Sequence, residues 1–537
     1  ISTETHAEVN ASGGWDLNDK VSTGILFHAQ NMSLELDHNH DGMLDMPKNT
    51  NINLLNRWYV KTGDYTGQFL VRGLYDRRIG GLTKEANQSA VLPYNIDLNT
   101  WRVDGFMKNG YVFDAETGTS IGIIAAASHH NQQNTYGAER QWDAAQTNAY
   151  LNAIFQTTFD DSATDLWDDH SHKLSAGLSI NYDRYSEAIG LLGDEAIRHE
   201  VTPGIFAEYT YTYKDKITLL AGIREDYSSR YGFFTTPRMN LRYAPFEWWT
   251  IRGSIGLGYR SPNAIADNAA FLASNRNFIF NPDDLVQERS MNTGLSTVFY
   301  IPIGKRELQL SGEYYYTNFL NGVIADMDRD IHNIYLYNHG QVDEAKYFSH
   351  NWQVEATMEI LRGWTMTAAF RYTDVQQTSF NTLANEWQLR DKPLQNKFKG
   401  IITTSYQTPL KTWQFDLTAQ FNGEGRMPDG FTIPEGSQQY KMHNGYIYHK
   451  WYPQLLGQIT KFFRTWSIYL GAENMTNFTQ DNPIVGERLE GRGERREAKG
   501  GGFVDPYSAN YDASMIWAPI HGWKMYIGFR WALERAE

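Results

Sequence analysis

Nine residues near the start of the chain have the spacing of a cation-binding loop. They read DHNHDGMLD, and every second position from the first offers an oxygen. Ca²⁺ takes about six to eight oxygen ligands, and such a loop has a glycine in sixth place, where this stretch has Gly42. The stretch therefore predicts a partial calcium site. Its candidate ligands are Asp37, Asn39, Asp41, the carbonyl of Met43, and Asp45.

The loop offers fewer oxygens than a complete site needs. A closing glutamate would stand in twelfth place, where the chain has Lys48, so water or a neighbouring loop must complete the shell. The alternative is a solvated turn, since Asn, Asp and Gly favour turns. A bound ion would fix the shape of the loop, so its role would be to preorganise a binding surface rather than to do chemistry.

A second candidate site lies in SHHNQQNTYG, which contains His129, His130 and Tyr136. Neighbouring imidazoles can bind copper, zinc or haem iron. We expect these residues in a long loop, where they would reach a ligand. The alternative is a pair of exposed loop histidines without a ligand.

A third candidate site stands where GSIGLGYRSPNAIADN runs from a strand into a long loop. Arg260, Asn263 and Asn268 could there hold an anionic or polar solute. The alternative is a network of charges that braces the surrounding structure.

The elements that must position these residues are strands. In TWQFDLTAQFNG, Trp413, Phe415 and Leu417 alternate with polar residues, and GWKMYIGFRW follows the same rule. Strict alternation over such lengths predicts strands with one apolar and one polar face. No amphipathic helix of any length is evident between them.

The connections between these strands alternate between short and long. Short ones include LNDK, YKDK and IPIGKR, and long ones include residues 129–146, 261–286 and 423–450. Short turns at one end and long loops at the other are typical of an up-and-down antiparallel barrel that spans an outer membrane. Tryptophans beside the short turns, such as Trp364 and Trp466, indicate an interfacial aromatic belt.

We count about 21 strands, whereas single-chain bacterial barrels have even numbers. We therefore expect residues 1–537 to form an all-β barrel domain of the type with about 22 strands, whose first strand is not in this chain. Barrels of that size hold a plug in the lumen, and none of these residues can form one. A plug domain is therefore expected outside this chain as well.

Composition agrees with this interpretation. The chain has 537 residues, 14% aromatic residues, no cysteine and a mean hydropathy of −0.53. No stretch approaches the roughly 20 apolar residues of a spanning helix. The net charge of −14 argues against nucleic acid as the main partner.

Several stretches resemble the TonB-dependent outer-membrane receptors of the Bacteroidetes type. LGAENMTNFTQDNPI resembles their penultimate strand, TPRMNLRYAP and GSIGLGYRSPNAIADN their central strands, and WKMYIGFRW their last strand. The resemblance covers essentially the whole chain as barrel. It implies a protein of the Gram-negative outer membrane that imports a scarce solute, with energy delivered by the TonB complex through the plug.

The resemblance implies a metal-containing solute, namely a cobalamin, a ferric siderophore or haem. The partners expected from it are the TonB complex, the solute, outer-membrane lipid and a surface lipoprotein, with calcium as the one resident ion. We find no G-x-S-x-G, H-E-x-x-H or P-loop motif, so an enzyme is not expected. The alternatives are a passive pore and a surface-binding barrel.

Overall fold

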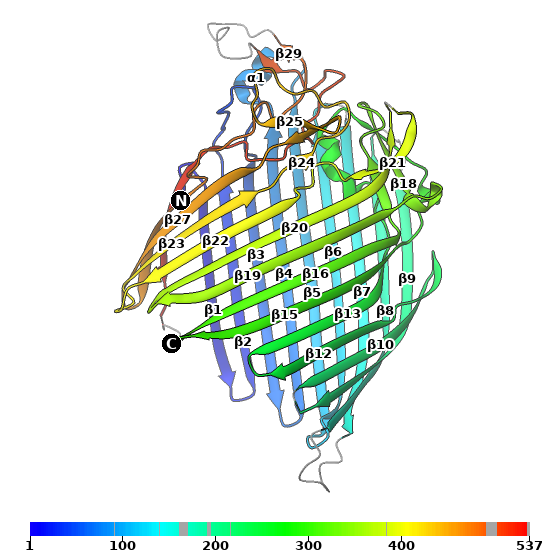
Figure 1. Ribbon diagram of the computed structural model, residues 1–537, viewed down its shortest axis with the longest axis vertical. Helices are drawn as coiled ribbons and strands as arrows, with labels where there is room; N and C mark the ends of the chain where they lie inside the picture. Colours follow the sequence, from blue (N-terminus) through cyan, green and yellow to red (C-terminus); the bar gives the residue numbers. More distant parts are fainter. Residues whose placement is uncertain are drawn as a thin grey trace.

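The computed structural model describes residues 1–90, 92–138, 140–159, 170–190, 195–214, 216–382, 384–489 and 502–533. Within these residues, one antiparallel sheet of 23 strands forms the wall of a barrel (Figure 1). Two of them, β11 and β21, pair only with the ends of β10 and β20 that lie at the loop end of the barrel. The other 21 run round the barrel, which confirms the predicted fold class and the predicted number of strands.

The long strands of the wall follow one another in chain order. They are β1 (Ala7–Asn18), β2 (Val21–Met32), β3 (Lys48–Thr62), β4 (Tyr65–Gly81), β5 (Asn95–Asp114), β6 (Thr119–Tyr136), β7 (Arg140–Phe159), β8 (His170–Ile189), β9 (Glu195–Tyr213), β10 (Ile217–Ser228), β12 (Arg238–Phe246), β13 (Trp249–Arg260), β15 (Glu288–Ile303), β16 (Arg306–Asn321), β19 (Tyr347–Leu361), β20 (Trp364–Asn381), β22 (Phe398–Gln407), β23 (Trp413–Asn422), β27 (Tyr452–Phe462), β28 (Trp466–Glu473) and β31 (Lys524–Trp531).

Short elements fill the connections at one end of the barrel. They are α1 (Lys84–Ser89), β11 (Gly232–Thr235), η1 (Ala266–Ala273), β14 (Asn277–Ile279), η2 (Pro282–Asp284), β17 (Val323–Asp326), β18 (Asn333–Asn338), η3 (His339–Gln341), β21 (Glu386–Asp391), β24 (Gly425–Arg426), β25 (Tyr440–His443), β26 (Tyr446–His449), β29 (Arg488–Leu489) and β30 (Phe503–Val504). No helix of the described residues is long and apolar enough to cross a membrane.

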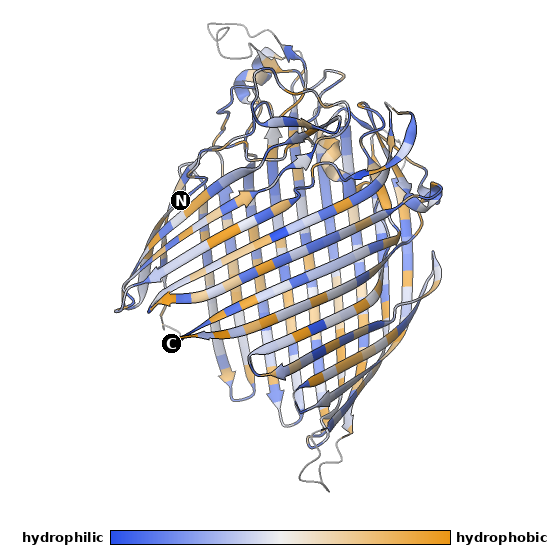
Figure 2. Cartoon of the chain, viewed as in Figure 1, coloured by the Kyte–Doolittle hydropathy of each residue, from blue (hydrophilic) through white to orange (hydrophobic). Residues whose placement is uncertain are grey.

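Apolar and polar residues alternate along the wall strands (Figure 2). As predicted, the apolar residues are exposed on the outside of the barrel. On β8, Leu178 and Ile180 are 63% and 43% exposed on the outside, whereas Ser179 between them is 7% exposed. Aromatic rings gather at the short turns. Trp249 stacks on Phe299 with ring centroids 5.7 Å apart, as expected for an interfacial belt.

The first residues of the chain lie against the last wall strand. The Thr3 N–H donates to the Met525 carbonyl at 2.9 Å, and the Ile527 N–H donates to the Ile1 carbonyl at 2.9 Å. The N-terminal end therefore lies beside the loop-side half of β31, near the loops (Figure 1). The expected further strand and plug stay predictions.

The prediction of a long loop at residues 129–146 is wrong. β6 continues to Tyr136 and β7 begins at Arg140, so only a tight turn separates them. Here both faces carry polar residues, as in Gln132 and Gln133, so the alternation that marks a strand disappears from the sequence. Backbone pairing with the neighbouring strands still holds the segment extended.

The buried apolar clusters lie among the loops and the loop ends of the wall strands. One joins Met43, Tyr94, Val504 and Tyr511, and another surrounds Trp517. We call this assembly of loops the canopy. It consists of seven long connections at the loop end, namely residues 33–47, 82–94, 261–287, 322–346, 382–397, 423–451 and 474–523, so far as they are described.

Candidate functional site

A segment of the canopy crosses the mouth of the barrel and carries η1. Two arginines of the wall hold its ends. Arg198 donates to the Pro262 carbonyl at 2.9 Å and also to the amide oxygen of Asn263. Arg140 donates to the Leu272 carbonyl at 3.3 Å. The segment divides the mouth into separate cavities.

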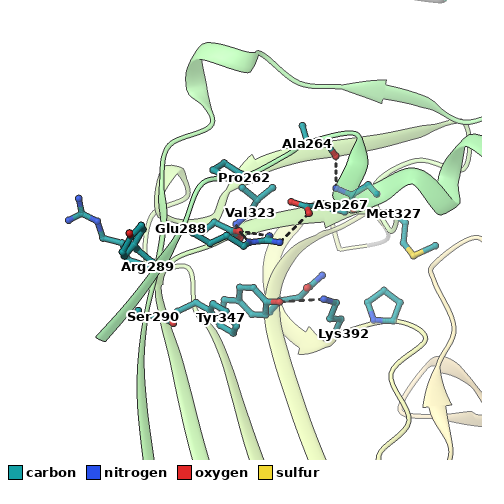
Figure 3. Close-up of a pocket in the computed structure, with 18 of the residues that line it drawn as sticks. Pro262, Ala264, Asp267, Glu288, Arg289, Ser290, Val323, Met327, Tyr347 and Lys392 are labelled. Atoms are coloured by element: carbon teal, nitrogen blue, oxygen red, sulfur yellow. Dashed lines mark hydrogen bonds and ion pairs between the residues drawn. The ribbon is translucent and has the colours of Figure 1, made fainter. Parts of the chain in front are cut away.

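A first cavity has a volume of about 580 Å³, and Figure 3 shows residues that line it. Its walls come from the loop ends of β13, β15, β19 and β20 and from the segment that carries η1. Lys392 and Pro393 close it from another part of the canopy. Tyr259, Phe271 and Tyr347 contribute aromatic rings.

This first cavity contains one cation that is neutralised by carboxylates and one that is not. The guanidinium of Arg260 donates to Glu288 at 2.6 Å and to Asp267 at 3.1 Å, so its charge is neutralised. The ammonium of Lys392 donates to the Tyr347 hydroxyl at 3.3 Å. Among the described residues, no carboxylate forms an ion pair with Lys392, so this cation is available to a solute.

A second cavity of about 470 Å³ lies across η1 from the first. His130, Gln132, Tyr136 and Asn263 line it together with Glu187. The Nε2 atom of His130 lies 3.2 Å from the amide oxygen of Gln132. A third cavity of about 420 Å³ is lined by Arg198, Arg230 and Tyr231, among others.

The structure brings some of the predicted residues together and separates others. Arg260 and Asn268 line the first cavity, whereas His130, Tyr136 and Asn263 line the second. His129 points away from both, because neighbouring residues of a strand face opposite sides. Its Nδ1 atom lies 2.8 Å from the Thr147 hydroxyl on the outer face. His129 and His130 therefore cannot share one metal ion.

Most oxygens of the DHNHDGMLD loop accept backbone hydrogen bonds. Asp37 accepts from the N–H groups of Asp41 and Gly42, both at 3.1 Å, and Asp41 accepts from the Met43 N–H at 2.8 Å. In the part of the chain that the structure describes, no group of three or more His, Cys, Asp or Glu side chains is placed to hold a metal. The turn interpretation thus accounts for most of these contacts.

Two features of this loop fit a cation nonetheless. The Oδ1 atom of Asp45 is buried without a hydrogen-bond partner, while its Oδ2 atom accepts from the His38 N–H at 2.8 Å. Burial raises the pKa of Asp41 to about 6, which indicates that its negative charge lacks a sufficient counter-charge. The calcium site stays a prediction.

Sequence reasoning missed the groups that fix the canopy and the cation of the first cavity. Arg426 donates to Asp328 at 2.6 Å, and both side chains are 1% exposed. Burial opposes ionisation, yet Arg426 holds the pKa of Asp328 below its ordinary value. Arg276 and Asp512 form a second buried pair at 2.8 Å. These partners lie far apart in the sequence, so no motif could have revealed them.

The comparisons with known proteins identify the family. The sequence model described as TonB dependent receptor-like, beta-barrel matches residues 28–475. The chain belongs to this family. Its members are transporters and receptors, and their barrels lie in the outer membrane of Gram-negative bacteria. A search of curated proteins found no match.

Solved structures with the same fold include receptors for iron complexes. The siderophore receptor PirA from Pseudomonas aeruginosa is 12% identical, with a TM-score of 0.60 over 98% of this chain and 76% of that chain. The ferric-catecholate import receptor Fiu from E. coli K12 is 12% identical, with a TM-score of 0.65 over 98% and 80%. The ferric citrate transporter FecA is 10% identical, with a TM-score of 0.64 over 98% and 76%.

Proposed function

We propose that this chain is the barrel of an outer-membrane active transporter whose solute is an anionic ferric chelate of the siderophore class. The observation that carries this proposal is the first cavity, at the mouth of the barrel, with the unpaired Lys392 ammonium beside Tyr347. Its volume of about 580 Å³ lies within the range of small-molecule sites. The similarity to PirA, a siderophore receptor, and to Fiu, a ferric-catecholate import receptor, supports the same solute class.

Haem and cobalamin are the other solutes of the expected class. Haem iron takes an axial protein ligand, often histidine, and of the paired histidines only His130 reaches a cavity. A ferric chelate with phenolate or carboxylate oxygens instead needs a cation and aromatic surface. Lys392, Tyr347 and Phe271 supply these.

The binding experiment uses the full receptor purified in detergent. Tryptophan-fluorescence titration with a ferric catecholate, ferric citrate, haem and cobalamin measures the dissociation constants. Lys392→Gln should weaken binding of the ferric chelate about tenfold or more, the loss expected for one charge-assisted contact. Lys399→Gln is the matched control, because Lys399 lines a different cavity. Equal affinity of Lys392→Gln and wild type would refute the site.

We also propose that uptake is energised through a plug that occupies the lumen and contacts the TonB complex. Radiolabelled chelate uptake by cells that make the full receptor should stop when TonB is deleted. Equal uptake with and without TonB would instead support the passive pore. The titration with purified receptor tests the solute separately from the energy source, because binding does not need energy.

Calcium at the DHNHDGMLD loop is the remaining proposal about this site. The ion would be held by Asp37, Asn39, Asp41, the Met43 carbonyl and Asp45, and it would draw on the unpartnered Oδ1 atom of Asp45. Calcium should then slow proteolytic cleavage of residues 33–47 relative to EGTA, and Asp45→Asn should abolish the protection. Asp64→Asn, in an exposed turn at the opposite end, should leave it intact. Identical cleavage with calcium and EGTA would rule the site out.

A further inference from the structure

Three basic side chains form a row on the wall. In the register of β6 to β9, His129 pairs with Thr147, Thr147 with Arg184, and Arg184 with His199. Directly paired residues of antiparallel strands share a face, with Cβ atoms about 5 Å apart. The row therefore crosses four strands, with an imidazole at each end and a guanidinium between them.

The row faces the outside of the barrel. Arg184 has the same parity on β8 as Leu178 and Ile180, which are 63% and 43% exposed. His199 has the same parity on β9 as Ile205, which is 58% exposed. The lumen-facing neighbours have the opposite parity, so none of the row reaches the cavities at the mouth.

The row marks the upper edge of the apolar band. The outward positions of β8 between Leu174 and Arg184 are all apolar or aromatic. They are Ala176, Leu178, Ile180 and Tyr182. The ten-residue interval spans about 26 Å along the barrel axis, at about 3.4 Å per residue and a tilt of about 40°. This equals the height of about 25 Å expected for the lipid-facing band. Headgroups therefore meet the wall at Arg184.

The positive charge of the row is not balanced by the protein. Among the described residues, Arg184 forms no ion pair with a carboxylate. His129 and His199 use their Nδ1 atoms, at 2.8 Å from Thr147 and 3.1 Å from Tyr182. Their Nε2 atoms make no hydrogen bond within the part of the chain described.

Other charged groups on this outer face either pair with one another or accept hydrogen bonds from neutral donors. Arg77 pairs with Asp97 at 2.7 Å. Asp143 and Glu195 lie two outward positions nearer the loops than the row, and they accept from Gln141 and Ser186. The row is therefore a cationic site without an internal counter-ion, directly above an apolar surface.

We propose that His129, Arg184 and His199 bind the phosphate of a phosphorylated lipid headgroup in the outer leaflet. A guanidinium can donate two parallel hydrogen bonds to a phosphate. The two imidazoles stand on either side of Arg184, His199 on the next strand and His129 two strands away. The apolar positions below, such as Tyr182 and Ile180, take the acyl chains. The inference rests on the outer-membrane location and not on the import of any solute.

Native mass spectrometry of the full receptor tests this inference. The receptor is exposed to lipid A, which carries phosphates on a glycolipid, or to phosphatidylcholine, which has no net charge. The wild-type receptor should retain more lipid A than phosphatidylcholine. Arg184→Gln should lower the retention of lipid A about tenfold. Arg77→Gln is the matched control on the same face, because its cation is already paired. Equal retention by wild type and Arg184→Gln would overturn the proposal.

Two further measurements distinguish a bound lipid from a free anion and from a change in the fold. Millimolar inorganic phosphate should not displace lipid A, and full displacement would mean a free-anion site instead. The single variants His129→Gln and His199→Gln should each lower lipid A retention while circular dichroism stays unchanged. Unchanged retention in both would overturn the three-residue site. Chelate binding by Arg184→Gln should match wild type, so failure of the lipid site is distinguishable from failure of the proposed import.

Discussion

Gly42 illustrates how much of the canopy depends on a single residue. Its φ angle is +85°, and a Cβ atom there would lie 2.6 Å from the ring of Phe503. The adjacent Val504 N–H donates to the Asp41 carbonyl at 2.8 Å. Gly42 therefore lets the segment at β30 dock on the DHNHDGMLD loop.

Gly42→Ala should undock this segment. An L-residue at a positive φ is strained, and the new methyl group would push Phe503 away, at a cost of about 1 kcal/mol or more. Hydrogen exchange of residues 502–512 should accelerate. Gly63→Ala provides the control, since Gly63 also has a positive φ of +54° but nothing lies within 4 Å of its Cβ position. Equal exchange in both variants would show that the Phe503 contact is unimportant.

Residue types alone predicted part of the candidate site. Arg260, Asn268 and His130 do line cavities at the mouth, because they lie where strands enter the canopy. His129 faces outward because neighbouring residues of a strand face opposite sides. The sequence predicts a loop at this residue, where no such rule applies. Lys392 and Tyr347 were not predicted, because 45 positions separate them in the sequence and only the fold brings them together.

At the scale of elements, alternation predicted the wall strands well and their loop ends poorly. A lipid-facing strand must alternate, because one face meets hydrocarbon and the other water. Beyond the membrane that requirement ends, and β6 and β7 continue with polar residues on both faces. Their extended conformation there depends on neighbouring strands, which a single sequence does not reveal.

The small sheet of β24, β25 and β26 has a pH-dependent element. His449 is fully buried against Trp517, with ring centroids 4.2 Å apart, and burial lowers its pKa to about 4. The ordinary value is 6.5, so below pH 6.5 the undocked state binds more protons. Docking is therefore most stable above pH 6.5. It weakens as pH falls towards 4, by about 3 kcal/mol in total.

Hydrogen exchange of residues 440–449 measures this dependence. Exchange, corrected for its intrinsic pH dependence, should reveal more frequent opening at pH 4.5 than at pH 7.5. His449→Asn should remove the difference, whereas His443→Asn should retain it because His443 is exposed. The same pH dependence in His449→Asn would assign the effect to another group.

At the scale of the whole molecule, two kinds of stabilisation divide the chain. Backbone pairing between consecutive strands holds the wall, whose apolar side chains face outward. Buried apolar clusters and buried ion pairs such as Arg276–Asp512 hold the canopy. A buried pair loses much more when one partner is removed than it contributes as a pair. The canopy therefore depends on tertiary contacts, whereas the wall depends on backbone pairing.

The orientation of the barrel in the membrane can be tested with single introduced cysteines. Residues 1–537 contain no cysteine, so they add no background to the label at an introduced cysteine. Ser89→Cys places a thiol on exposed α1 in the canopy, and Leu410→Cys places one in a short turn, where Leu410 is 84% exposed. With the long loops outside, as in barrels of this kind, a membrane-impermeant maleimide should label only Ser89→Cys on intact cells. Leu410→Cys should react after lysis, and the reverse pattern would place the cavities beside Lys392 on the periplasmic side.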